Sequence, residues 1–357
     1  VVTGCYSAMS KEEELLEAGA NLVIANSEKE RLAELVGERL NIPGSCERAE
    51  APAETLFARG KDRAFVKIQD GCRYRCSFCI VTIARGDERS RSVEEVTEEV
   101  YSLVKAGINE VVLTGVHVGG FGSDHGKDLA TLIQALFDQT AMPRIRLSSL
   151  EPWGVSDSLI ECFQNPRLLP HLHLPVQSGS DSVLKRMARR IDISGYQKLI
   201  GRFDHIKDMT FTTDIIVGFP GETEEEWQET LDFVRQMSFS DVHVFPFSAR
   251  EGTRAAVMEN QLNGHIIKAR VESLQPLVDA SKKRVRDRFI GHKMDVMWES
   301  AIEQDEQGRS WCTGYTPNYI KVAMPFSNER QVAGITQEVE LRKVNLDKGW
   351  IEVELLV

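Results

Sequence analysis

The chain contains no run of about 20 apolar residues, the length that a membrane-spanning helix needs, so we expect no membrane segment. Cysteines are also few, with seven in 357 residues. Most are isolated and three crowd one loop, a usage that fits a reducing compartment, and we expect a cytoplasmic protein. The net charge of −11 argues against a protein that coats nucleic acid indiscriminately, although it is compatible with a local basic surface.

Cys72, Cys76 and Cys79 form a CxxxCxxC loop. Three thiolates can hold three irons of a four-iron cluster and leave the fourth iron open for chemistry. A closed zinc site normally has four protein ligands, often as paired CxxC motifs, and no second pair follows downstream. Three thiols this close together also pair poorly as disulfides. We therefore favour a cluster, and we expect Cys162 and Cys312 to be small buried hydrophobes.

Between residues 64 and 246, short apolar runs alternate with amphipathic helices, two of which begin with a capping box at Ser92 and Thr223. This alternation predicts right-handed crossovers and a parallel sheet. Six such units are too few for a closed eight-stranded barrel. We therefore expect an α/β fold with a partial, open (βα)6 barrel whose site lies at the carboxyl ends of the strands. The expected strands are 64–68, 110–113, 144–147, 171–174, 211–217 and 242–245.

The segment before this core, residues 1–46, looks like the remnant of an N-terminal α/β domain. It has a strand candidate at 21–25, with helix candidates at 11–18 and 28–40. This is too little for a complete domain, and the chain does not begin with methionine. We therefore expect a fragment truncated at its N-terminus.

The core is expected over residues 58–288 and closes with a long helix that Pro276 interrupts or kinks. Residues 289–357 carry short alternating runs separated by turns, which predict a small antiparallel β-barrel. Such barrels often bind single strands through aromatic and basic side chains, here Tyr315, Tyr319 and Lys321. A purely structural role for the barrel is the alternative.

Three basic runs, 85–91, 185–190 and 282–288, bear on nucleic-acid binding. Any one of them is typical of a solvated helix face. Together they leave RNA binding open despite the acidic total.

The CxxxCxxC loop directly after the first strand of a six-unit βα chain resembles the radical S-adenosylmethionine superfamily. Four further features resemble its methylthiotransferases: Arg85-Gly86 with Arg89-Ser90-Arg91, the run 171–180, the run 214–223, and a C-terminal barrel similar to the TRAM domain. The runs 113–122, 244–254 and 314–321 resemble most the branch that acts on N6-threonylcarbamoyladenosine at position 37 of tRNA.

The resemblance implies a [4Fe-4S] cluster on Cys72, Cys76 and Cys79 that binds S-adenosylmethionine, with a 5′-deoxyadenosyl radical taking the hydrogen from adenine C2. It also implies a second [4Fe-4S] cluster, held by three N-terminal cysteines, that supplies the methylthio group. Cys5 matches one of those ligands and the other two are absent from the sequence. We expect Cys46 to be structural.

The family pattern also implies roles for individual side chains. Contacts to S-adenosylmethionine are expected from the ends of strands two to five, at Thr114, Gly115, Glu151, Gln177, Ser178, Asp214 and Gly218. Arg85, Arg89 and Arg91 are expected to meet phosphates of the tRNA anticodon loop. His117, His171 and His173 are expected in hydrogen-bonding or core roles rather than as metal ligands. The electron donor is expected to be flavodoxin-like or ferredoxin-like.

Two alternatives share the chemistry: modification of isopentenyladenosine at the same tRNA position, and modification of a ribosomal protein. A third belongs to another class, namely a zinc-stabilised RNA-binding module without catalysis. Uptake of four irons with sulfide, as opposed to one zinc, separates the enzyme from that module.

Overall fold

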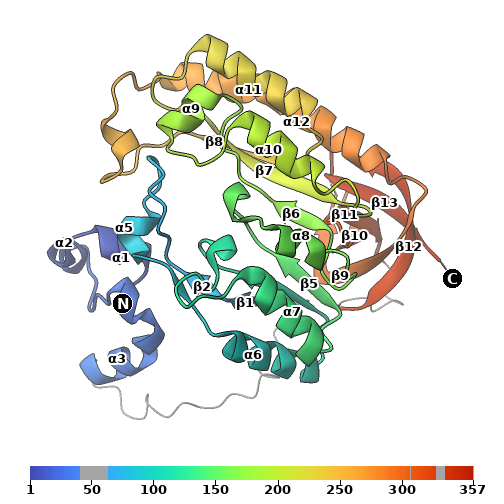
Figure 1. Cartoon of the computed structure of the whole chain (residues 1–357), viewed down its shortest axis with the longest axis horizontal. Coiled ribbons are helices and arrows are strands. Elements are labelled where there is room, and N and C mark those ends of the chain that lie inside the picture. The colour runs from blue at the N-terminus through green and yellow to red at the C-terminus, as the bar shows by residue number, and fades with distance from the viewer. Residues whose placement is uncertain (41–62, 306, 327–333, 357) are drawn as a thin grey trace.

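A computed structural model describes residues 1–40, 63–305, 307–326 and 334–356. Cys46 and the expected boundaries at residues 46 and 58 lie outside these ranges. Figure 1 shows N-terminal helices at one end of the molecule, an α/β core in the middle and a β-barrel at the other end. No helix in the described ranges is both long enough and apolar enough to cross a membrane.

The core contains six parallel strands in chain order. The first sheet is β1-β4-β5 and the second is β6-β7-β8, and single bridges from Ile145 to Leu168 and from Ser149 to His173 link the two. The six strand predictions are confirmed to within about two residues at each end. The strands are β1 (Ala64–Lys67), β4 (Glu110–Thr114), β5 (Arg144–Leu147), β6 (His171–His173), β7 (Thr210–Val217) and β8 (Asp241–Pro246).

Helices cover one side of these strands. Both predicted capping boxes are present, at Ser92 and Thr223. The last helix runs without interruption through Pro276, because Leu274 and Val278 on either side are fully buried against the core and hold it in place. The helices are α6 (Val93–Lys105), α7 (Leu129–Gln139), α8 (Asp157–Cys162), α9 (Asp181–Arg186), α10 (Ile193–Gly201), α11 (Glu224–Gln236) and α12 (Gly264–Asp287), with short η2 (Val118–Gly120), η3 (Pro152–Gly154) and η4 (Arg254–Val257).

The two faces of the strands differ in chemistry. Val111, Leu113 and Ile145 point into the hydrophobic core under the helices. Phe65, on the opposite face, is 61% exposed. Histidines, arginines, threonines and an aspartate share that opposite face, whereas parallel strands are usually apolar on both sides. The polar face therefore lines an interior space and is not packed core.

The N-terminal piece consists of α1 (Cys5–Met9), α2 (Glu12–Glu17), η1 (Asn26–Arg31) and α3 (Leu32–Arg39). Both predicted helices are found, the second one beginning as a 3-10 turn. The predicted strand at 21–25 is wrong, since it is reduced to a single bridge between Val2 and Val23. A strand needs a hydrogen-bonded neighbour along its length, and Val2 is the one partner that the described residues supply.

The C-terminal segment forms a closed five-stranded barrel in the order β10-β11-β13-β12-β9. The prediction of a wholly antiparallel barrel is wrong, because β11 and β13 run parallel. An odd number of strands cannot alternate in direction around a closed ring, so at least one neighbouring pair must be parallel. The strands are β9 (Lys293–Gln304), β10 (Ser310–Tyr315), β11 (Lys321–Pro325), β12 (Thr336–Asn345) and β13 (Trp350–Leu355).

A buried charge cluster joins the barrel to the core. The carboxylate of Glu110, with no exposed surface, accepts from Arg144 Nε at 2.9 Å, accepts from Arg146 Nε at 3.3 Å, and lies 3.6 Å from Arg63 Nε. Arg146 also donates to the carbonyl of Pro317 at 3.1 Å, and Arg63 pairs with Glu299 of the barrel at 3.0 Å. The barrel is therefore fixed to the amino-terminal half of the core strands.

Candidate active site

The cysteine loop is held between two very short strands that the sequence did not indicate. β2 (Gln69–Asp70) pairs with β3 (Arg89–Ser90), and α5 (Val81–Arg85) lies between them. The loop begins at Gly71, which has φ 74°, and a Cβ there would lie 2.0 Å from the carbonyl oxygen of Asp87. Only glycine fits where these two backbone segments approach each other, and this close approach sets the position of Cys72.

The three thiols lie within residues 72–79 of one loop, and Cys76 and Cys79 line the same cavity. Burial raises the pKa of all three and brings that of Cys72 to about 11. Iron binds thiolates, so cluster insertion must displace their protons. Three half-buried thiols in one loop match the ligand set of a four-iron cluster with one open iron.

Arg189 connects this loop to the ends of the strands. Its Nη1 donates to Cys76 Sγ at 3.8 Å, and its Nη2 lies 2.6 Å from Glu151 Oε2. The guanidinium also lies over the ring of Trp153, 4.4 Å from the centroid. Burial opposes its charge, but Glu151 and Cys76 outweigh that effect and raise the pKa of Arg189.

The sequence gave no sign of this role, because Arg189 belongs to a basic run, 185–190, that we considered for RNA. In the structure Arg189 is buried and Arg186 pairs with Glu226 at 2.6 Å. Two of the four cations of that run are therefore held in internal contacts, whereas Lys185 and Arg190 are exposed.

Thr114 and Gly115 end β4 beside this loop. The space where a side chain of Gly115 would lie is taken by Gln69, whose carbonyl oxygen and Oε1 are both 3.0 Å from a built Cβ. Gln69 Oε1 also accepts from the backbone N–H groups of Val116 and His117, at 3.1 and 2.9 Å. Gln69, another residue that sequence reasoning missed, thus orders the turn that carries Thr114 and Gly115.

Gln177 has φ 81°, a left-handed conformation that costs a non-glycine residue about 1–3 kcal/mol. It is held there by backbone bonds to Asp214 and Ile216, both at 2.9 Å. Strain of this kind gathers at functional sites. The position supports a role for Gln177 at the end of β6.

Ser178 and Gly218 are engaged inside the protein. The hydroxyl of Ser178 is fully buried and lies 3.3 Å from that of Thr230 on α11. Gly218 has φ 79°, and a Cβ there would lie 2.5 Å from Ile267. These contacts account for both residues without a cofactor.

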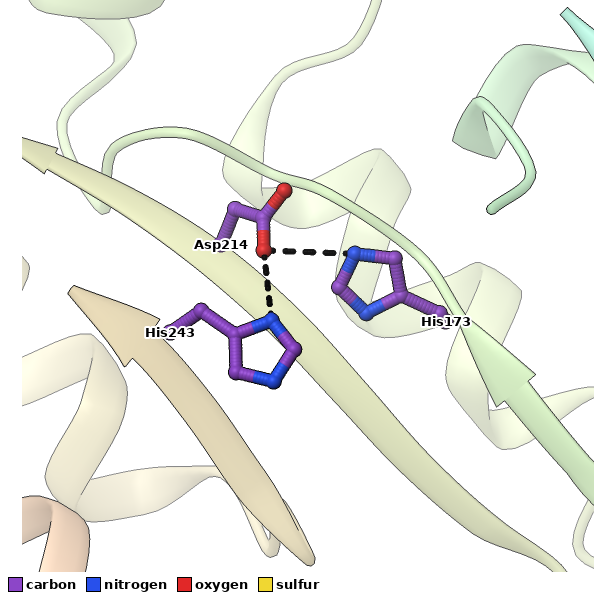
Figure 2. A group of neighbouring side chains, drawn as sticks. All are labelled: His173, Asp214 and His243. Atoms are coloured by element: carbon purple, nitrogen blue, oxygen red, sulfur yellow. Dashed lines mark hydrogen bonds and ion pairs between the residues drawn. The ribbon is translucent and has the colours of Figure 1, made fainter. Parts of the chain in front are cut away.

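Asp214 lies on the polar face of the strands, between two histidines (Figure 2). Its Oδ1 accepts from His173 at 3.2 Å and from His243 at 3.1 Å. Burial works to raise the pKa of Asp214, but these two hydrogen bonds outweigh it and lower the pKa to about 2. One ligand atom from each residue lies within 4.8 Å of the others, as a cation would require, yet the shared carboxylate oxygen already explains the arrangement.

The predicted hydrogen-bonding roles of His117, His171 and His173 are confirmed. His171 and His173 both contact Thr212 Oγ1, at 3.1 and 2.8 Å. His117 is buried, 2.6 Å from Glu88. Of the isolated cysteines, Cys312 is buried in the barrel as expected, while Cys162 is only half-buried.

Cys5 lies beside the cysteine loop although the chain places it far away. Arg85 Nε donates to Cys5 Sγ at 3.3 Å, and Arg85 Nη1 pairs with Asp70 at 3.0 Å. Asp70 comes two residues before Cys72. One arginine therefore bridges the N-terminal helix α1 and the start of the loop, and it is not free for the phosphate contact that we expected.

Of the other residues expected to bind RNA, Arg91 is occupied by Glu99 and by the carbonyl of Lys67, whereas Arg89 is exposed. Tyr315 and Tyr319 stack on each other with centroids 4.7 Å apart. Both tyrosines and Lys321 line a cavity shared with the polar face of the core strands. The expected RNA face of the barrel is therefore turned toward the core.

One cavity, of about 370 Å³, is lined by residues that include Gln69, Asp70, Arg89 and Arg91. Two further cavities adjoin the cysteines and the barrel. One, of about 530 Å³, is lined by Cys76, Cys79 and residues of the 252–254 turn. The other, of about 470 Å³, lies between the polar face of the strands and the barrel. A larger cavity, of about 990 Å³, has none of the expected site residues among its described lining residues.

Comparison with known proteins identifies the family. Residues 66–234 match the Radical SAM superfamily. A threonylcarbamoyladenosine tRNA methylthiotransferase (MtaB) of Bacillus subtilis is 36% identical over 96% of this chain and 78% of the relative. A tRNA-2-methylthio-N(6)-dimethylallyladenosine synthase of Desulfitobacterium hafniense is 37% identical over 83% and 67%. Among solved structures, coproporphyrinogen III oxidase (HemN) of Escherichia coli, a radical SAM enzyme, aligns with 83% of this chain and 72% of its own, with a TM-score of 0.49 and 12% identity. The extent of the match to the Bacillus relative, together with the cysteine loop, shows that the chain belongs to the radical SAM tRNA methylthiotransferases.

Proposed function

We propose that this protein transfers a methylthio group to C2 of N6-threonylcarbamoyladenosine at position 37 of tRNA. The observation that carries the proposal is the group of three thiols in one loop at the carboxyl ends of parallel strands, where Cys76 and Cys79 line a cavity of about 530 Å³. The Bacillus relative, which matches nearly the whole chain, bears the name of that activity.

Cys72, Cys76 and Cys79 would hold a [4Fe-4S] cluster whose open iron binds S-adenosylmethionine. When bound, this pair supplies the one-electron cleavage and the hydrogen abstraction that the reaction needs. The chain's own residues position the partners. Arg189 holds Glu151 at the end of β5, where its carboxylate can accept from a ribose hydroxyl.

Other residues would complete the binding site for S-adenosylmethionine. The turn at Thr114 and Gly115, ordered by Gln69, would receive the methionine amino group. Gln177 and Asp214 would form the wall toward the strands, and Ser178 and Gly218 would support it from behind. The task of these groups is to exclude water and to align the reacting atoms.

We also propose that Cys5 is a ligand of a second [4Fe-4S] cluster, as the family pattern implies. Arg85 supports this role, because a guanidinium 3.3 Å from the sulfur stabilises the thiolate. The same arginine contacts Asp70, two residues before Cys72, so it links the segments that would hold the two clusters.

The proposed architecture has three parts: an N-terminal part over residues 1–46, a radical SAM core with a partial (βα)6 barrel over 58–288, and a TRAM-like barrel over 289–357. The six parallel strands in chain order support the partial barrel. Arg89, Tyr315, Tyr319 and Lys321 are proposed to face the anticodon loop. A tRNA substrate implies a cytoplasmic enzyme, served by a flavodoxin-like or ferredoxin-like electron donor.

A second candidate is modification of the isopentenylated (dimethylallylated) adenosine. It is favoured by one observation, the 37% identity to the Desulfitobacterium synthase. That relative covers 83% of this chain, whereas the Bacillus relative covers 96%.

The test is to express the complete gene that encodes this chain in cells lacking such enzymes of their own, and to analyse their tRNA nucleosides by mass spectrometry. We expect 2-methylthio-N6-threonylcarbamoyladenosine. A methylthio group on isopentenyladenosine instead would overturn the choice of substrate. Uptake of one zinc, in place of four irons with sulfide, during anaerobic reconstitution would overturn the enzyme assignment altogether.

A further inference from the structure

The cavity of about 470 Å³ lies where the polar face of the core strands meets the barrel. Its core wall includes His173 and His243, and its barrel wall includes the stacked Tyr315 and Tyr319. Aromatic rings and polar groups together suit a base that carries a polar substituent. We refer to this space as the interdomain cavity.

The cations on the wall of the interdomain cavity are mostly neutralised by partners in the protein. Arg146 pairs with Glu110, and Lys321 pairs with Glu303. Arg63 contacts both Glu110 and Glu299. These side chains are held by the protein and are not available as the main contact for a ligand.

Arg286 is different. It lies in the last turn of α12 and is only 8% exposed, and it also lines the interdomain cavity. Its Nη2 donates to the carbonyl of Gly349 at 3.0 Å, but no carboxylate of the described residues lies within ion-pair distance of its guanidinium. The acidic side chain on the described wall, Asp241, is bound by Lys282 at 2.7 Å.

Asp241 and Asp279 favour the charge of Arg286 from a distance, but burial outweighs them and lowers the pKa of Arg286. A buried cation without a contacting counter-ion is unfavourable. An anionic ligand group in the interdomain cavity would offset that cost. Arginine is also the side chain best suited to bind a carboxylate through two parallel hydrogen bonds.

The position of the interdomain cavity fits one end of the proposed substrate. The cysteine loop lies at the carboxyl ends of the strands, whereas the lining of the interdomain cavity extends from the amino ends of β6 and β8, at His171 and Asp241, to the carboxyl end of β5, at residues 147–149. In adenine, C2 and C6 lie on either side of N1, so a base that presents C2 to the cysteine loop directs its N6 substituent away from it. A threonylcarbamoyl substituent ends in a carboxylate, whereas an isopentenyl substituent is apolar.

We propose that Arg286 binds the carboxylate of the N6-threonylcarbamoyl group within the interdomain cavity, and that this contact selects the substrate. The inference rests on the proposed function, since it assigns part of the same site to one portion of that substrate. A phosphate of the tRNA backbone would use the same chemistry, and the experiment must separate the two.

The experiment uses the protein expressed from the complete gene and reconstituted anaerobically, and it measures binding to three anticodon stem-loops by fluorescence anisotropy. The first RNA carries N6-threonylcarbamoyladenosine, the second its carboxylate methyl ester, and the third unmodified adenosine. The variants are Arg286→Met, which keeps the length and loses the charge, and Arg286→Lys, which keeps the charge. The matched control is Arg284→Met, because Arg284 is exposed on the same helix two residues away.

Wild-type enzyme is expected to bind the acid roughly 10–100-fold more tightly than the ester, a ratio that corresponds to about 1.4–2.8 kcal/mol. Arg286→Met should lose most of that preference, Arg286→Lys should keep part of it, and Arg284→Met should keep all of it. The same variants should change KM for the modified RNA more than kcat.

Equal binding of acid and ester by the wild type would overturn the inference, even if no Arg286 variant folds. Equal weakening of all three RNAs by Arg286→Met would assign the arginine to a backbone phosphate instead. Failure of the proposed function has a separate signature, namely no 2-methylthio product from the first RNA. Formation of the methylthio product by an enzyme that binds acid and ester equally would refute only the proposed carboxylate contact.

Discussion

Arg189→Met is expected to destabilise the fold and loosen the site together. The substitution removes the ion pair to Glu151 at 2.6 Å, the contact to Cys76 Sγ and the stacking on Trp153, while methionine fills most of the space. Arg189 has 1% of its side chain exposed, so no water replaces the lost partner at Cys76. The main cost is that the Glu151 carboxylate remains without its counter-ion.

Breaking a buried ion pair by removing one partner costs about 3–5 kcal/mol of unfolding free energy. The Glu151 side chain is 25% exposed, so water solvates part of the stranded carboxylate. We therefore expect the lower end of that range, about 3 kcal/mol. Adding Glu151→Gln removes the stranded charge and should restore about 1–3 kcal/mol.

The assay is urea unfolding of the reduced, metal-free protein under anaerobic conditions, followed by circular dichroism. Arg190→Met is the matched control, because Arg190 is exposed and stacks on Tyr74, a contact worth about 1 kcal/mol or less. The reasoning fails if Arg189→Met costs no more than this control. It also fails if the double variant is no more stable than Arg189→Met alone.

Cys76→Ala should stop formation of 5′-deoxyadenosine from S-adenosylmethionine in reconstituted protein, and continued formation would show that the cluster is bound elsewhere. Glu110→Gln should lower the unfolding free energy by about 3–5 kcal/mol, because it leaves the buried guanidiniums of Arg144 and Arg146 without a carboxylate partner. Urea unfolding measures this, and a loss below about 1 kcal/mol would refute the buried-pair account. The hydrogen bond to Asp214 raises the pKa of His243 above its ordinary 6.5. The resulting stability is therefore full below pH 6.5 and is lost as the pH rises through the raised pKa, a decline that His243→Gln should lack when unfolding is compared between about pH 6 and 8.

The core strands were predictable because short β-type runs alternate with helical segments along the chain, and that alternation predicts a parallel sheet. The cysteine loop was predictable because its three ligands are adjacent in sequence. Arg189 was not, since nothing in a basic run says which arginine turns inward. That choice depends on Glu151 and Trp153, which lie some 40 residues earlier in the chain.

The polar interior could also have been predicted, from the alternation of polar and apolar residues in β6 and β7. His171 and His173 alternate with Leu172 in β6, and Thr212 and Asp214 lie on alternate positions of β7. Alternation in a parallel strand indicates one face turned to a cavity. The parallel contact between β11 and β13 could not be read in this way, because it depends on barrel closure.

The junction between core and barrel bears on how such enzymes can be recombined. Arg146 of the core bonds two barrel carbonyls and lies 4.6 Å from the ring centroid of Tyr319, so the 315–321 loop is shaped by a residue from another part of the chain. A chimera that exchanges barrels between relatives at residue 289 would combine that loop with the core of another protein. The residue at the position of Arg146 in that core would not have been selected to fit the loop. A functional chimera must therefore take Arg146 and the 315–321 loop from the same parent protein.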